Sequence, residues 1–333
     1  DESPRDAAMT AAQDVLSGAL TPRRTDEIQV KPNHAHLDEM ESKLSQTHSH
    51  LVSPHKCVEA VRASCLPLSE GLNVERQAFL DSMKTPQRAG LIHAFFGERS
   101  VSKVPEAKLS PRELAQVGVI GGGTMGSGIA TACLLAGLEV MLVETTQEAL
   151  DIGISAIYKN LERAVKRGKL AKDKFDATTA NLRGELELTA LDQVDLVIEA
   201  VFENMGVKKD IFVELDKICK PRAILASNTS YLDLDEIAGT TSRPEDVIGL
   251  HFFSPAHVMR LLEIVVGAKT DQRVTATGFA LAKRLRKIGV KSGVCDGFIG
   301  NRILAHYRKT AAYLVLDGAS PQEVDRALEE FGF

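Results

Sequence analysis

A glycine-rich turn, placed between an apolar run and a helix-forming segment, constrains the fold of this sequence more than any other feature. The apolar run Val117–Ile120 leads into the spacing G-x-G-x-x-G, which permits a tight turn, close approach of a pyrophosphate, and close packing of a helix on a strand. The helix that opens there presents unpaired N–H groups to a phosphate. The pattern predicts a dinucleotide-binding βαβ unit. The residues expected to contact the dinucleotide are Gly121, Gly123, Thr124, Met125 and Gly126.

An acidic residue after the next predicted strand distinguishes between the two nicotinamide dinucleotides. Glu144 follows Val140–Val143, about 20 residues beyond the first glycine, where a carboxylate accepts hydrogen bonds from the adenosine ribose hydroxyls and repels a 2′-phosphate. The next residues are Thr145 and Thr146, so no arginine stands there to receive that phosphate. We therefore expect NAD rather than NADP as the cofactor.

Short apolar runs alternate with helix-length segments from Leu114 onward, which is typical of a mainly parallel sheet covered on both faces. The predicted fold class is therefore α/β, with a Rossmann-type sheet. The expected strands are Val117–Ile120, Val140–Val143, Val194–Val201, Ala223–Ala226, Val247–Phe253 and Leu261–Val266. The expected helices between them are 125–136, 147–168, 205–219 and 271–288. After Gly289 the pattern becomes helical, at Phe298–Leu316 and Pro321–Phe331.

The first hundred residues have a different character. Helical patterns occupy part of 1–20 and the segments 56–66, 70–84 and 87–100, and the two prolines in 101–111 are typical of a linker. On the third of these helices, Leu72, Phe79, Leu80 and Met83 lie near one face. The predicted domains are a helical region over 1–105, a nucleotide-binding domain over 112–294, and the start of an all-helical domain over 295–333.

A polar segment from Thr21 to Lys56 contains five of the nine histidines. Four of them form two His-x-His pairs, a composition that can bind metal ions. No acidic or cysteine partner stands at a recognisable ligand spacing, so we expect a solvated surface and no metal site.

Composition and charge exclude several other classes of protein. A length of 333 residues suggests about two domains. The balance of 45 acidic against 40 basic residues, a net charge of -5, argues against a nucleic-acid-binding surface over the whole molecule. No apolar run approaches ~18 residues, so no membrane span is expected. Five cysteines without a C-x-x-C pair favour free thiols.

Polar residues end two of the predicted strands and interrupt a third. The segments 226–230 (ASNTS) and 251–255 (HFFSP) lie where ligands bind in open α/β sheets, outside the carboxyl ends of the strands. Glu263 lies inside an apolar run, and a buried carboxylate requires a partner. A neutral His251 hydrogen-bonded to it would be oriented to accept a hydroxyl proton as hydride leaves the same carbon. The alternative is a core histidine in a structural ion pair, and spacing alone leaves both open.

Five ordered motifs give the chain, from about Gln116 to its end, a resemblance to the L-3-hydroxyacyl-CoA dehydrogenase family. They are GGGTMGSG (121–128), DLVIEAVFEN (195–204), ASNTS (226–230), HFFSPAHVMRLLEIV (251–265) and DGFIGNR (296–302). The resemblance implies NAD-dependent oxidation of an L-3-hydroxyacyl-CoA in fatty acid β-oxidation, with His251 as the general base and Glu263 as its orienting partner. The residues that it places around the ligands are Ser230 and Asn301 at the 3-oxygen and thioester, Glu203 and Lys208 near NAD, and Asn160 and Arg167 at coenzyme A. For the basic helix end that contains Arg167, a solvated surface is the alternative.

One position departs from the single-function members of the family. They carry Asn where this sequence has Ser254, a further expected substrate contact, and Ser-Pro-Ala-His at this place resembles the multifunctional β-oxidation enzymes. The segments 70–83 and 91–100 resemble the helices that join an enoyl-CoA hydratase (crotonase) part to the dehydrogenase part, and 1–25 resembles the tail of the hydratase part. The resemblance implies an internal fragment without hydratase activity, whose C-terminal helical domain would continue beyond the last residue.

Alternatives to an active dehydrogenase module remain at this stage. They are an NAD-binding module left catalytically incomplete by truncation, another 3-hydroxyacid dehydrogenase, which would use a catalytic lysine instead, and a purely structural role. The expected partners are the acyl-CoA substrate, the missing parts of the same polypeptide, and a second copy joined through the absent C-terminal helices. A bacterial cytoplasm is the favoured location, ahead of a peroxisome or mitochondrion.

Overall fold

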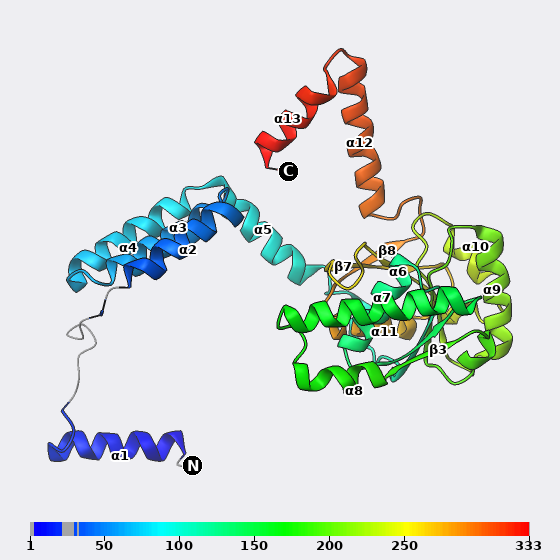
Figure 1. Ribbon diagram of the computed structural model, residues 1–333, viewed down its shortest axis with the longest axis horizontal. Coiled ribbons are helices and arrows are strands. Elements are labelled where there is room, and N and C mark those ends of the chain that lie inside the picture. The colour runs from blue at the N-terminus through cyan, green and yellow to red at the C-terminus, as the bar shows by residue number, and fades with distance from the viewer. Residues whose placement is uncertain (1–2, 22–29, 32, 333) are drawn as a thin grey trace. The chain divides into compact units, whose positions relative to one another are not determined.

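Two compact units make up the chain in the computed structural model, which describes residues 3–21, 30–31 and 33–332. The first unit ends at Phe95, and the second runs from Phe96 to Phe331 (Figure 1). The polar segment expected from Thr21 to Lys56, and the residues 1–25 compared with a hydratase tail, lie partly outside the described residues.

The first unit is helical in its described residues. Its helices are α1 Pro4–Ser17, α2 His34–Thr47, α3 Val52–Ala63, α4 Leu68–Met83 and α5 Pro86–Ser100, the last of which crosses into the second unit. Helix α3 packs against α2 and α4. Helix α2 lies in a segment whose weak periodicity did not predict it, although Leu37, Met40 and Leu44 do recur at helical spacing.

The apolar stripe of α4 stays on the surface of this unit. Leu72 and Phe79 are 52% and 59% exposed, and Leu80 and Met83 are each more than one third exposed. The amphipathic pattern therefore predicted the helix, but the described residues do not bury its apolar face.

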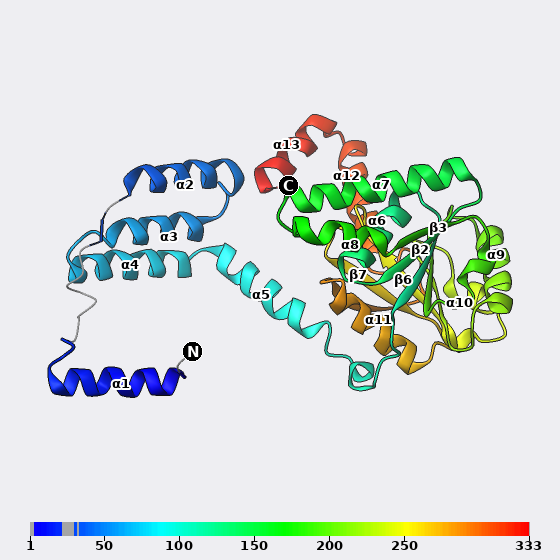
Figure 2. The ribbon, with the colours of Figure 1, turned by 60° about the horizontal axis from the view of Figure 1, so that its bottom comes forward.

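An eight-stranded sheet forms the centre of the second unit in the part of the chain that the structure describes (Figure 2). The strands are β1 Gln116–Ile120, β2 Glu139–Val143, β3 Leu182–Glu185, β4 Leu196–Glu199, β5 Ile224–Ser227, β6 Val247–Phe252, β7 Leu261–Val266 and β8 Ile288–Gly293. Their spatial order is β3-β2-β1-β4-β5-β6-β7-β8. Strands β1 to β6 are parallel, whereas β7 pairs antiparallel to β6 and parallel to β8. The strand order 3-2-1-4-5-6 is that of a Rossmann fold, which confirms the predicted fold class.

Helices cover both faces of this sheet and then continue beyond it. They are α6 Thr124–Leu135, α7 Gln147–Lys166, α8 Phe175–Ala180, α9 Met205–Ile218, α10 Leu234–Ala238, α11 Gln272–Arg284, α12 Gly300–Leu316 and α13 Pro321–Phe331. Short 3₁₀ helices are η2 Pro105–Lys108, η3 Lys172–Lys174, η4 Leu188–Leu191 and η5 Pro244–Asp246. Side chains at the N-caps start several helices, because Thr146, Asn204 and Asp271 each accept a backbone N–H of α7, α9 and α11.

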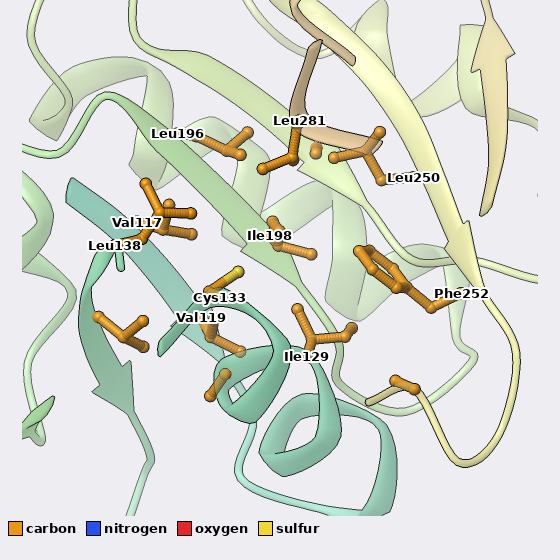
Figure 3. Packing of buried hydrophobic residues seen from close by; sticks show 14 of the residues in the cluster. Val117, Val119, Ile129, Cys133, Leu138, Leu196, Ile198, Leu250, Phe252 and Leu281 are labelled. Carbon is orange, nitrogen blue, oxygen red and sulfur yellow. The ribbon is translucent and has the colours of Figure 1, made fainter. Parts of the chain in front are cut away.

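Alternating residues of the central strands build an apolar layer on each face of the sheet. On one face, Val119 and Ile198 pack in the same cluster as Ile129 of α6 (Figure 3). On the other face, Val197 packs in a second cluster with Phe212 of α9. Because successive side chains of a strand point to opposite faces, a strand buried on both faces needs a continuous apolar run. This is the pattern from which the central strands were predicted.

The two strands that the sequence did not predict, β3 and β8, are the edges of the sheet. They are only partly buried, and they contain Arg183 and Lys291. An edge strand is covered less completely than a central one, so its sequence lacks a continuous apolar run. The prediction of a helix as far as residue 288 was wrong, because α11 ends at Arg284 and β8 occupies the following stretch. The short helices α8 and α10 were also not predicted.

The glycine-rich turn joins β1 to α6, and its glycines differ in how closely other atoms approach them. Gly121 has a φ of 96°, which lies in the left-handed region, and its N–H donates to the carbonyl of Val143 at 3.0 Å. A Cβ on Gly126 would lie only 1.7 Å from the carbonyl oxygen of Gly121, so the helix could not pack where it does. By contrast, a Cβ on Gly123 would meet no atom within 4 Å.

These contacts predict that two neighbouring glycines respond differently to the same substitution. Gly126→Ala should lower the free energy of unfolding by about 1–3 kcal/mol or more, because the backbone must shift to relieve the overlap. Gly123→Ala should leave the stability nearly unchanged. Urea denaturation of both variants measures the difference, and equal stabilities would contradict this account of the turn.

Candidate active site

A histidine and a glutamate face each other on the antiparallel strands β6 and β7. His251 is the direct cross-strand partner of Glu263, so their side chains lie on the same face of the sheet. Nδ1 of His251 lies 2.7 Å from Oε2 of Glu263. The two residues are almost completely buried, with 3% and 0% of their surfaces exposed. Strand register, rather than a loop, thus brings this predicted pair together.

The second carboxylate oxygen of Glu263 binds the start of α12. Oε1 accepts the N–H of Ile299 at 3.2 Å and the N–H of Gly300 at 2.7 Å. Gly300 is also close to Phe253, since a Cβ on this residue would lie 2.9 Å from the phenylalanine ring. Glu263 therefore connects three elements. It belongs to β7, it contacts His251 of β6, and it accepts hydrogen bonds from the N-terminus of α12.

This environment determines the orientation of the imidazole ring. A carboxylate oxygen accepts hydrogen bonds, so an Nδ1–H of His251 can donate to Oε2 of Glu263, and in a neutral imidazole this tautomer leaves the lone pair on Nε2. The rings of Phe253 and Phe298 lie 4.5 and 5.6 Å from the imidazole ring, centroid to centroid. In that tautomer Nε2 is a hydrogen-bond acceptor, which is the form that a general base requires.

A buried ion pair supports the neighbouring strand ends. Glu199, the last residue of β4, is fully buried and accepts hydrogen bonds from Nζ of Lys208 at 2.7 Å and from the hydroxyl of Ser227 at 2.7 Å. Asn228 follows β5, and its side-chain oxygen accepts the N–H of Phe252 at 2.9 Å. These contacts fix the ends of β4, β5 and β6 relative to one another.

Glu203 orders the segment that carries Ser230. One of its oxygens accepts the hydroxyl of Thr229 at 2.7 Å and the backbone N–H groups of Ser230 at 2.7 Å and Tyr231 at 3.1 Å. Burial by itself would raise the pKa of Glu203, but these hydrogen bonds and the charge of Lys208 outweigh it and hold the pKa below its usual value. The carboxylate therefore stays ionised and keeps the segment in place.

Lys208 has no direct access to a ligand in this arrangement. It is 1% exposed, and its ammonium group lies 2.7 Å from Glu199 and 3.4 Å from Glu203. The sequence predicted Lys208 near NAD, and the structure places it behind Glu203.

The glycine-rich turn and the end of α7 share one cavity of about 580 Å³. Its lining includes two residues predicted to reach coenzyme A, Asn160 and Arg167, together with Gly123 and Thr124 of the turn. The N-terminus of α6 has no side-chain cap, so its first N–H groups remain available to a phosphate. Met125, the next residue of that helix, is half-buried. An uncapped helix terminus beside a cavity, with room at Gly123, fits the pyrophosphate of a dinucleotide.

Glu144 lies at the adenosine end expected for such a ligand. Its two oxygens accept the N–H groups of Gly122 at 2.6 Å and Thr145 at 3.1 Å. The carboxylate thus stands directly beside the turn, where it can receive ribose hydroxyls.

The remaining predicted residues follow β5 and β6 or lie in the first turn of α12. Ser230 follows β5 and is partly exposed, and Asn301 is partly exposed in the first turn of α12. Ser254 is exposed in the loop after β6. The sequence analysis did not single out Glu199. It singled out Glu263 because that acid lies within an apolar run, and Glu199 shows the same pattern.

Lys287 holds the loop that carries Ser254. Its ammonium group donates to the carbonyls of Ala256 and Met259, both at 2.6 Å, and lies 5.5 Å from the ring centroid of Phe252. Burial lowers the pKa of Lys287 to about 8. No pattern in the sequence marks this lysine, because its partners come from a different part of the chain.

The sequence matches two family profiles in succession. The profile of the "3-hydroxyacyl-CoA dehydrogenase, NAD binding domain" covers residues 116–295, and that of the "3-hydroxyacyl-CoA dehydrogenase, C-terminal domain" covers 297–333. The chain therefore belongs to the 3-hydroxyacyl-CoA dehydrogenase family of oxidoreductases. Its sheet and surrounding helices are the NAD-binding domain of that family, which confirms the predicted resemblance and cofactor.

Proteins of peroxisomes are among the relatives. The peroxisomal bifunctional enzyme of Danio rerio is 43% identical over 85% of this chain and 40% of its own length. That of Cavia porcellus is 39% identical over 100% of this chain and 47% of its own length. The chain thus spans less than half the length of these two relatives. The crystal structure of 3-hydroxybutyryl-CoA dehydrogenase from Escherichia coli superposes with a TM-score of 0.61 at 37% identity, over 63% of this chain and 44% of that one.

Each helix in the described part of the chain is too short or too polar to cross a bilayer. Within the same residues, no group of three or more histidine, cysteine, aspartate or glutamate side chains could hold a metal ion.

The contacts of Glu263 predict its effect on stability. Glu263→Ala should lower the free energy of unfolding by about 3–5 kcal/mol, because it removes the partner of a buried histidine and of two backbone N–H groups. Glu214→Ala is the matched control, since Glu214 forms an exposed pair with Lys217 and its loss should cost less than about 1 kcal/mol. Urea denaturation measures both, and similar losses would show that the Glu263 contacts are not structural.

Proposed function

We propose that this chain is the dehydrogenase module of a multifunctional β-oxidation enzyme and oxidises L-3-hydroxyacyl-CoA to 3-ketoacyl-CoA. The observation that carries the proposal is the buried His251–Glu263 pair, with Nδ1 and Oε2 2.7 Å apart in a family NAD-binding domain. A bound NAD would supply the hydride acceptor for C3 of the substrate. His251 accepts the proton of the 3-hydroxyl at Nε2 in the same step, so the carbonyl forms without a free alkoxide.

Glu263 has two tasks in this mechanism. It stabilises the imidazolium that forms when His251 takes the proton, and it prevents the proton from residing on Nε2 beforehand. Ser230 and Asn301 would donate hydrogen bonds to the developing carbonyl and the thioester region. Ser254 would make a further contact with the substrate. Glu203 would contact the bound NAD, with Lys208 acting through it.

The proposed cofactor and substrate positions follow from the cavity beside α6. The pyrophosphate of NAD would lie at Gly121, Gly123 and Gly126, with Thr124 and Met125 supplying helix N–H groups and Glu144 receiving the ribose hydroxyls. Coenzyme A would extend along α7 past Asn160 to Arg167. These placements rest on the lining of the cavity and on the uncapped helix.

A second candidate function is NAD binding without turnover. None of the described residues of α12 and α13 is buried, so these helices do not enclose the side of the site that Asn301 occupies. An open site admits water and leaves the substrate less well ordered.

The location of the protein and its assembly are further parts of the proposal. The peroxisomal and glyoxysomal names of the relatives favour a peroxisome over the bacterial cytoplasm expected from the sequence. A homodimer formed through further C-terminal helices stays a prediction, as do contacts with other parts of a longer polypeptide.

The proposal predicts that the chain oxidises NADH in the presence of acetoacetyl-CoA. This activity should depend on Nε2 of His251. His251→Gln should lower kcat by about 10²–10⁴, and Glu263→Gln should also lower it because an amide facing Nδ1 favours the proton on Nε2. NADH binding, followed by fluorescence, should change little in either variant. The exposed His93→Gln is the control.

The outcomes separate the two candidate functions. Turnover that is lost in the two variants supports the dehydrogenase. Tight NADH binding without turnover of the unmodified chain supports the incomplete module. Turnover that survives His251→Gln would contradict the assignment of the base.

A further inference from the structure

The loop between β6 and β7 forms part of the wall of the cavity beside α6, and Ser254 lies near its start. The residues of this loop that line the cavity are Pro255, His257 and Val258. Ala256 is fully buried and packs on α6, where a Cβ on Gly128 would lie only 3.1 Å from the Cβ of Ala256. A change in the position of this loop would therefore change the shape of the cavity.

Two cations outside the cavity hold this loop. Nζ of Lys287 donates to the carbonyls of Ala256 and Met259, both at 2.6 Å. The guanidinium group of Arg260 donates two hydrogen bonds to the carboxylate of Glu98, at 3.0 and 2.9 Å. A bidentate pair of this kind fixes direction as well as distance. Neither cation is among the described residues that line the cavity, so both act on it through the loop.

Glu98 belongs to a segment that precedes the two matched family profiles. It lies in the last turn of α5, a helix that begins in the first unit and ends in the second. The segment 98–112, or strap, continues along the second unit, and its 3₁₀ helix η2 packs on α11. The matched domain does not include the strap, so the contacts of Glu98 are additional to that domain.

Two further ion pairs fix the strap against the second unit. Glu106 accepts a hydrogen bond from Nζ of Lys291 on β8 at 2.5 Å. Arg112 pairs with Asp246 at 2.6 Å, with both side chains mostly buried, and its backbone N–H donates to the hydroxyl of Thr277 on α11 at 2.9 Å. Breaking a buried pair is costly, because it leaves an uncompensated charge. These contacts determine the path of the strap and place its first residue beside the loop.

We propose that Glu98 and Lys287 are positioning residues for the acyl-CoA substrate, and that the strap makes the dehydrogenase site depend on the end of α5. The inference rests on the proposed function, because it assigns a task to the loop that carries Ser254. Both residues hold the loop in the position that receives the substrate. Proton transfer at His251 and NAD binding at the glycine-rich turn do not involve them.

Steady-state kinetics of the full chain with NADH and acetoacetyl-CoA tests this positioning role. Glu98→Gln should raise KM for acetoacetyl-CoA about two- to fivefold, because it removes an exposed ion pair. Lys287→Gln should raise it about tenfold, because hydrogen bonds to two carbonyls are lost. The values of kcat and of KM for NADH should stay within about twofold. Glu214→Gln, which removes an exposed pair with Lys217 elsewhere on the surface, is the control and should change nothing.

Charge reversal separates positioning from general destabilisation. Glu98→Arg places two cations side by side and should raise the same KM. Adding Arg260→Glu should restore it, because the pair forms again with opposite polarity. Thermal melting checks that every variant folds, and Glu98→Gln, which alters only surface contacts, keeps the test valid if Lys287→Gln does not.

Hydrogen exchange of the loop 254–260, followed by mass spectrometry, gives a measurement that needs no turnover. The N–H groups of Val258 and Met259 both donate to the carbonyl of Pro255, at 2.9 and 3.0 Å. They should exchange faster in Glu98→Gln and Lys287→Gln than in the control variant, because local opening exposes them.

Several results would overturn the inference. They are an unchanged KM for acetoacetyl-CoA in both variants, equal exchange in the loop, and a parallel loss of kcat and NADH binding. Failure of the double variant to recover would also overturn it, since Glu98 and Arg260 would then not act through each other. Absence of turnover in the unmodified chain would instead contradict the proposed function, and the exchange rates would still support or overturn the hold of the strap on the loop.

Discussion

The rest of the site depends on the hydrogen bonds that the carboxylate of Glu263 accepts. A buried charge is stable only when its hydrogen-bonding capacity is filled, and here one oxygen receives His251 while the other receives the first N–H groups of α12. The same group therefore orients the imidazole and fixes where the C-terminal helices leave the sheet. Because β6 and β7 are antiparallel neighbours, a shift of one residue in register would place the two side chains on opposite faces and destroy the site.

A second buried carboxylate stabilises the adjoining strand ends by a different means. Glu199 is neutralised by the ammonium group of Lys208 and bound by the hydroxyl of Ser227. Glu203 then holds the segment after β5 through the backbone. The carboxyl ends of these strands are thus already ordered by protein groups, which in the proposed mechanism reduces the reorganisation needed during the reaction.

The sequence predicted most of what lies at the centre of the molecule and little of what lies at its edges. Central strands were recognisable because burial on both faces requires continuous apolar runs, whereas the edge strands β3 and β8 lack them. The pairing of His251 with Glu263 was foreseeable from an acid within an apolar run, and Glu199 carries the same signal. The surroundings of Lys287 were not foreseeable, since its neighbours come from several segments that only the fold brings together.

The account as a whole depends on the position of one proton. Nitrogen-15 spectra of histidine-labelled protein, assigned with His251→Gln, report which ring nitrogen is protonated. If Glu263 accepts a hydrogen bond from the ring, Nδ1 of His251 will carry the proton and Nε2 will be bare near neutral pH. A proton on Nε2 in the neutral ring would contradict the account, because His251 could then not accept a proton from a substrate hydroxyl.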